Sequence, residues 1–180
     1  MTLYTFGHGT LEEAAFARLL LDADLHDLVD IRSFPGSRRN PQFGREAMEH
    51  WVPDAGIGYT WLRVLGGRRK PVADSPHVAL RHPSFRAYAD YMDTAEFVAG
   101  IDELLAAGSG RTVMCSESVW WRCHRRLVAD YVTLVRDIPV EHLMHDGRRM
   151  AHRATDGVRR DGDRLVYDVG VMSPLPEVGC

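Results

Sequence analysis

Short apolar segments alternate with amphipathic helical segments along most of the chain, and this alternation constrains the fold more than any other feature. Apolar spacing, a capping-box pattern over 10–13 and a glycine stop at residue 56 predict where helices lie. Strands that alternate with helices predict an α/β fold, with a mainly parallel twisted sheet of about five strands and helices on both faces. The expected strands are 3–6, 28–32, 58–65, 111–115 and 139–144, and the expected helices are 11–23, 45–55, 84–107 in two pieces, and 122–135.

The length of 180 residues fits one domain with a sizeable core. We expect residues 1–168 to form this domain, with a small hairpin or extension near its end, and residues 169–180 to form a C-terminal tail. No apolar run approaches the roughly 18 residues that span a bilayer, so no membrane partner is expected. The amino terminus lacks a secretory-signal pattern and three cysteines make no disulfide framework, which favours a reducing cytoplasm.

Polar side chains gather where the expected strands end. In open parallel sheets, ligands bind beyond the carboxyl ends of the strands, where the loops open a crevice. Loops far apart in the sequence are therefore expected to meet on one rim. His8 follows the first expected strand, Arg32 the second, Gly66 and Gly67 the third, and Cys115 and Glu117 the fourth.

Arginine supplies 21 of the 22 basic residues, although the net charge of −3 gives no general reason to bind nucleic acid. The loop SFPGSRRN after the second strand combines serine, glycine and arginine, which suit phosphate or carboxylate oxygens, unless it is only a solvated basic loop. The expected partner is a phosphate-bearing or other anionic ligand, with nucleic acid as a further possibility. The candidate ligand-binding residues are Arg32, Ser37, Arg38, Arg39, Gly66, Gly67, Arg122, His124 and Arg125.

The segment VMCSESVWWRCHRR at 113–126 carries the densest set of reactive residue types. Cys115 fits two interpretations. It is either a small buried hydrophobe that ends a strand, or a thiolate nucleophile stabilised by arginines and a helix amino terminus. The strand-cysteine-loop-arginine-helix order is similar to that of protein phosphatases, but the spacing between Cys115 and Arg122 is one residue longer.

His8 and Glu117 complete the candidate catalytic set with Cys115. A histidine whose pKa lies near neutrality suits a general acid, unless it only caps its own turn. Glu117 is expected either to act as a general base or to hold Arg122 or Arg125 in place. Of the adjacent tryptophans at 120 and 121, one is expected in the core and one over a surface cleft.

No metal and no cofactor are predicted. Adjacent side chains on a helix diverge by about 100°, so Cys123 and His124 are not expected to face one small ligand. Spaced ligand pairs of the kind that zinc prefers are absent from the sequence, although Cys115, His8 and His124 could still meet in space around a metal. The favoured interpretation is a buried Cys123 against the sheet, with His124 and Arg125 at the helix start facing the crevice.

Several segments together resemble the bacterial family called domain of unknown function 488. They are YTFGHGTLEE, LVDIRSFPGSRRNPQFG, GIGYTWLRVLGG, SFRAYADYM and VMCSESVWWRCHRRLVADY followed by VEHLMHDG, and they cover about residues 3–168. Ser116 departs from the pattern, because an alanine is more usual there. The resemblance implies a fold and a site but no known reaction.

Two functions of different classes follow. The first is an enzyme, or an enzyme-like site, for a phosphate-bearing small molecule, a nucleotide or a nucleic-acid end. The second is a non-catalytic module that recognises nucleic acid or an acidic partner through arginine patches, with the cysteine segment bracing its loops.

Overall fold

The computed structural model describes residues 1–36, 38–106 and 110–170. Its centre is a six-stranded sheet in the order β3-β2-β4-β1-β5-β6, in which β1 to β5 run parallel and β6 pairs antiparallel with β5. This confirms the predicted α/β fold. The strands are β1 (Leu3–Gly7), β2 (Asp27–Asp30), β3 (Gly58–Trp61), β4 (Arg111–Cys115), β5 (Val140–Leu143) and β6 (Arg149–Ala151).

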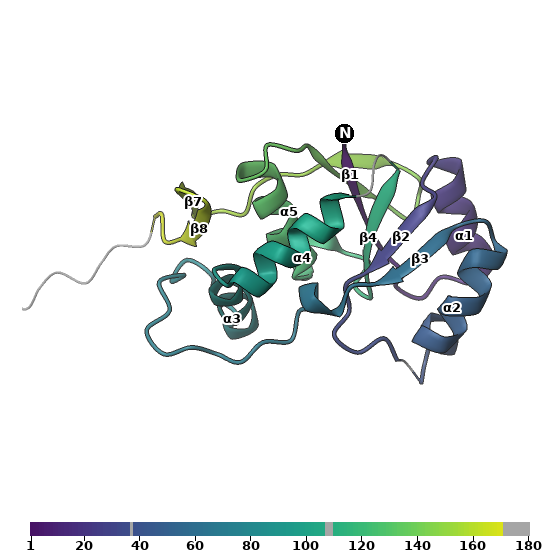
Figure 1. Cartoon of the computed structure of the whole chain (residues 1–180), viewed down its shortest axis with the longest axis horizontal. Coiled ribbons are helices and arrows are strands. Elements are labelled where there is room, and N and C mark those ends of the chain that lie inside the picture. Colours follow the sequence, from purple (N-terminus) through teal and green to yellow (C-terminus); the bar gives the residue numbers. More distant parts are fainter. Residues whose placement is uncertain (37, 107–109, 171–180) are drawn as a thin grey trace, which may run out of the picture.

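Helices cover both faces of the sheet (Figure 1). The α-helices are α1 (Glu13–Asp22), α2 (Arg45–Asp54), α3 (Pro83–Met92), α4 (Ala95–Ala106) and α5 (Arg125–Leu134), and three short 3-10 helices are η1 (Pro41–Phe43), η2 (Arg63–Leu65) and η3 (Trp120–Arg122). α1 and α2 pack on one face, and α3, α4 and α5 contribute to the core on the other.

Two hydrophobic cores follow from the alternation of side chains along the buried strands. Leu28 and Met114 point into the core beneath α1 and α2, whereas Val29 and Val113 point into the opposite core. A strand covered on both faces needs apolar residues at successive positions. This explains why β4 reads as a nearly continuous apolar run.

Several element boundaries differ from the predictions. β3 ends at Trp61, because the next residues turn into the 3-10 helix η2. α1 begins at Glu13 with no side-chain cap, so the predicted capping box does not form. α5 begins at Arg125, three residues later than expected, because η3 interrupts the segment before it. This last difference shapes the candidate site.

The predicted C-terminal hairpin is confirmed as β7 (Val158–Asp161) and β8 (Arg164–Tyr167), a separate two-stranded sheet. β8 packs near α3, and the Tyr167 hydroxyl donates a hydrogen bond of 3.0 Å to Asp130 on α5. Residues 171–180 of the predicted tail lie outside the described residues. Within the described part of the chain, no helix has both the length and the apolar character that a bilayer crossing requires.

Candidate functional site

The carboxyl ends of β2, β4 and β1 lie side by side, so their loops meet at one edge of the sheet. Gly7 of β1 pairs with Cys115 of β4, and Asp30 of β2 pairs with Met114. A cavity of about 790 Å³ opens at this edge. Of the predicted site residues, His8, Arg32, Gly67, Cys115, Glu117, Arg122 and His124 line it.

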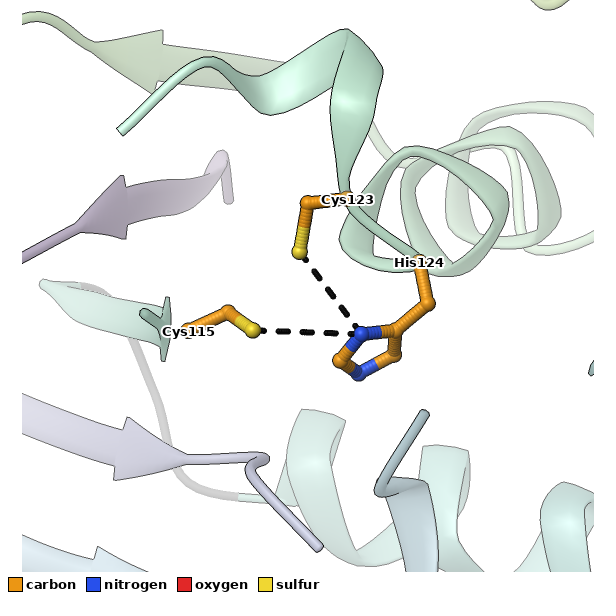
Figure 2. A group of neighbouring side chains, drawn as sticks. All are labelled: Cys115, Cys123 and His124. Carbon is orange, nitrogen blue, oxygen red and sulfur yellow. Dashed lines mark hydrogen bonds between the residues drawn. The ribbon is translucent and has the colours of Figure 1, made fainter. Parts of the chain in front are cut away.

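Cys115, Cys123 and His124 form the innermost reactive group, which we call the Cys–His centre (Figure 2). His124 Nδ1 lies 3.8 Å from Cys115 Sγ and 3.6 Å from Cys123 Sγ, and all three atoms lie within 4.8 Å of one another. The prediction that Cys123 and His124 diverge is therefore wrong. It assumed consecutive helical residues, but Cys123 has extended backbone angles (φ −119°, ψ 150°) and the helix begins only after His124.

Packing fixes the His124 ring against the two sulfur atoms. The ring lies edge-on to Tyr88, with 5.0 Å between centroids. On another side it lies so close to Gly67 that a Cβ atom there would be 2.5 Å from Nδ1. The Arg125 backbone N–H donates to Cys123 Sγ at 3.5 Å. Gly67 therefore serves the centre by leaving room for the histidine.

The two thiols differ in acidity. A hydrogen bond from Cys123 lowers the pKa of Cys115 well below its usual value, with help from His124 and Arg125 and against the effect of burial. Burial, together with neighbouring Cys115, raises the pKa of Cys123. Cys115 is buried at a strand end, as the first interpretation expects, and it also lines the cavity, so its role as a nucleophile stays a prediction.

His8 is held neutral beside this centre. Burial, followed by the charge of Arg32, lowers the pKa of His8 to about 4. Its Nδ1 lies 2.9 Å from the Gly9 carbonyl oxygen and donates to it, and Nε2 accepts from Arg32 Nη1 at 3.2 Å. His8, the predicted general acid, is therefore uncharged at neutral pH and has no imidazolium proton to give.

The Arg32 guanidinium forms its hydrogen bonds within the protein. It forms a bidentate pair with Asp30, at 2.8 Å from Nε and 2.6 Å from Nη2. Nη1 donates to the Phe43 carbonyl and to His8, and Nη2 also contacts the Met48 sulfur. All five N–H donors are engaged within the protein, so Arg32 positions His8 and has no spare donor for the predicted ligand-binding role, although it lines the cavity.

Other predicted ligand-binding residues also lie elsewhere. Arg125 is buried, and its guanidinium donates to the carbonyl oxygens of Glu117 and Ser118 instead of lining the cavity. Glu117 thus holds Arg125 in place with its backbone carbonyl oxygen and not with its carboxylate. Arg38 and Arg39 are exposed outside the cavity, and Gly66 packs on Ser33. Ser37 lies outside the described residues, so its predicted role stays a prediction.

Two residues of the cavity wall, Arg68 and Phe34, were not among the predicted site residues. Arg68 follows Gly67, and its guanidinium lies 5.6 Å from the Phe34 ring centroid. Phe34 is 64% exposed and Trp121 is 47% exposed, and both line the cavity. Trp120 is buried and Trp121 borders the cavity, as expected for the tryptophan pair. The GGRR motif at 66–69 was a usable signal for Arg68, because Arg68 directly follows Gly67, which was a predicted site residue.

A model of the family described as domain of unknown function DUF488 matches residues 12–132, well over half of the chain. The chain belongs to this family. No curated protein and no solved structure matches it significantly.

The segment that matches the DUF488 family contains the whole Cys–His centre and the arginines of the cavity wall. It is shorter than the expected range of about 3–168. β1 with His8 precedes it, and β5, β6 and the hairpin follow it.

This DUF488 protein also contains a buried polar network away from the cavity. His142 Nδ1 lies 2.6 Å from Thr5 Oγ1, and its Nε2 lies 3.0 Å from His152 Nδ1. His152 Nε2 in turn lies 2.9 Å from Asp130 Oδ1. Burial, together with neighbouring His152, lowers the pKa of His142 to about 2. Trp120 stacks on His142 at 4.0 Å between centroids, so the network joins β1, β5 and α5.

Proposed function

We propose that this protein is an enzyme that acts on a phosphate-bearing small molecule, a nucleotide or a nucleic-acid end bound in the cavity. The observation that carries the proposal is that the Cys–His centre lines the same cavity as two arginines that form no ion pair within the described part of the chain. The cavity volume of about 790 Å³ lies in the range of small-molecule sites. A purely structural role does not require reactive and cationic groups to converge on a cavity.

Arg68 and Arg122 are the arginines assigned to the anion. Both are exposed on the cavity wall, and neither forms an ion pair with a carboxylate among the described residues. A guanidinium with free donors matches the geometry of phosphate oxygens. The anionic part of the ligand therefore lies near these two side chains.

The aromatic residues of the wall favour a nucleotide or nucleic-acid end over a simple phosphate ester. Phe34 and Trp121 remain largely exposed although both are large and apolar. Exposed aromatic rings bordering a basic cavity offer faces on which a nucleobase stacks. Glu117 is the exposed carboxylate of the wall, and we assign it the general base. We propose a reducing cytoplasm as the compartment, and the free cysteines of the centre support this proposal.

The proposal is tested by calorimetric titration with inorganic phosphate, adenosine monophosphate and a short 5′-phosphorylated oligonucleotide. We expect Arg68→Ala and Arg122→Ala each to weaken binding by about tenfold or more, since a hydrogen bond to a charged group contributes roughly 1.5–3 kcal/mol. Arg38→Ala is the matched control, because this exposed arginine lies outside the cavity. Product analysis with Glu117→Gln then tests whether a bound ligand is turned over.

Binding that depends on Arg38 and not on Arg68 contradicts the proposal. If that binding also weakens steeply with salt and no ligand is converted, the protein is instead a non-catalytic module for nucleic acid or an acidic partner.

A further inference from the structure

We propose that Cys115, Cys123 and His124 bind a divalent transition-metal ion of the zinc type, with one coordination position open to the cavity. The metal would be held by Cys115 Sγ, Cys123 Sγ and His124 Nδ1. This goes beyond the proposed anionic ligand and does not depend on it.

The spacing of the three atoms is the first argument. Zinc bonds of about 2.3 Å to sulfur and about 2.0–2.1 Å to nitrogen give tetrahedral S···N edges of about 3.6 Å. The observed S···N separations are 3.6 Å for Cys123 and 3.8 Å for Cys115. The S···S edge of such a tetrahedron is about 3.8 Å, and the two sulfur atoms lie within 4.8 Å of each other. A metal ion therefore fits after small side-chain adjustments.

The donor set is the second argument. Two thiolates and an imidazole are soft to borderline ligands, which select zinc-type ions over magnesium or calcium. No carboxylate belongs to this group among the described residues. The ligands also come from rigid positions: the end of β4, the extended residue before α5, and the residue that caps α5.

Neighbouring groups hold two of the three ligands, Cys123 and His124, in place. The Arg125 N–H donates to Cys123 Sγ, and a backbone donor of this kind stabilises a metal-bound thiolate. Gly67 and Tyr88 confine the His124 ring so that Nδ1, not Nε2, faces the sulfur atoms. Cys123 and His124 are thus held before any ion binds, and Cys115 is fixed by its place at the end of β4.

Three protein ligands leave a tetrahedral ion with a fourth position. All three residues line the cavity, so a water molecule or a ligand atom reaches that position. Three ligands with an open position are typical of catalytic zinc sites, whereas structural sites are closed by a fourth residue. Nearby His8 is not that residue, because Arg32 and Gly9 already engage both of its ring nitrogens.

The site is tested with Co²⁺ as a spectroscopic probe. The full-length chain, reduced with a phosphine and freed of metal, is titrated with Co²⁺ and then with Zn²⁺. We expect one Co²⁺ per chain, with a near-ultraviolet thiolate-to-cobalt band and the visible bands of tetrahedral Co²⁺, all of which Zn²⁺ removes. Cys115→Ser, Cys123→Ser and His124→Asn are each expected to lower the affinity at least 100-fold.

Two variants serve as matched controls. His82 also lines the cavity but lies outside the centre, so His82→Asn keeps wild-type Co²⁺ affinity. Cys180→Ser removes the remaining thiol of the sequence and likewise keeps the bands. Circular dichroism verifies that each variant is folded, and the wild-type stoichiometry and spectrum test the site even where a variant fails to fold.

The proposal is overturned if the reduced chain binds no Co²⁺, or if Co²⁺ binds without thiolate bands. A Cys115–Cys123 disulfide that persists in the presence of reductant overturns it as well, since the ligands are then consumed. Failure here leaves the arginine-dependent binding of phosphate compounds intact, so the two proposals are separable.

Discussion

Replacing Gly67 by alanine is expected to disturb the Cys–His centre from a residue that bears no reactive atom. The added Cβ would lie 2.5 Å from His124 Nδ1, 2.6 Å from Cγ and 3.0 Å from Cε1. Ordinary contact begins near 3.4 Å, so the ring has to retreat by about 0.9 Å. Tyr88 packs against the ring and limits that retreat. Overpacking of this kind costs about 1–3 kcal/mol of unfolding free energy.

Gly36 offers a matched control on the same cavity wall, because a Cβ there meets no atom within 4 Å. Urea unfolding is expected to show the full loss for Gly67→Ala and a change within about 0.5 kcal/mol for Gly36→Ala. Co²⁺ titration is expected to show a 10- to 100-fold loss of affinity for the first variant alone, as for other supporting residues of metal sites. Wild-type stability and Co²⁺ affinity in Gly67→Ala would refute the reasoning, since the ring then does not pack where the structure places it.

Two further predictions concern buried ionisable side chains. Asp30→Asn leaves the Arg32 guanidinium buried without its carboxylate, so urea unfolding is expected to show a loss of about 3–5 kcal/mol. The control is Glu49, which forms an exposed ion pair with Arg45. Glu49→Gln is expected to lower the free energy of unfolding by less than about 1 kcal/mol. Equal losses for the two variants would contradict the assignment of the Asp30–Arg32 pair as a buried ion pair. In the folded chain the pKa of His142 is about 2 and that of His8 is about 4, whereas in the unfolded chain both histidines have the ordinary pKa of 6.5. Stability is therefore full above pH 6.5 and falls as the pH drops below it, by up to about 1.4 kcal/mol per pH unit for each histidine. Unfolding measured at pH 7, 6 and 5 checks this, and a flat profile would disprove it.

The α/β architecture and the location of the site were predictable from local patterns. Alternation of apolar strands with amphipathic helices is encoded within short windows, and the strand-end rule then brought His8, Cys115 and Glu117 to one edge. The exposed strand β6 was missed, because its three residues are too few to show an alternating pattern. It forms by antiparallel pairing with the preceding strand β5, and its own residues give no signal for that pairing.

The sequence by itself determined the family, the alternating elements and the edge of the sheet where reactive residues collect. Only the tertiary structure decided what each of those residues does there. The N–H donors of Arg32 all bind Asp30 and other neighbouring groups. Cys123 lies next to the His124 ring because the helix begins two residues after Cys123. The physical reason is that hydrogen-bond partners and backbone angles at a loop are set by packing between distant segments, which no local pattern records.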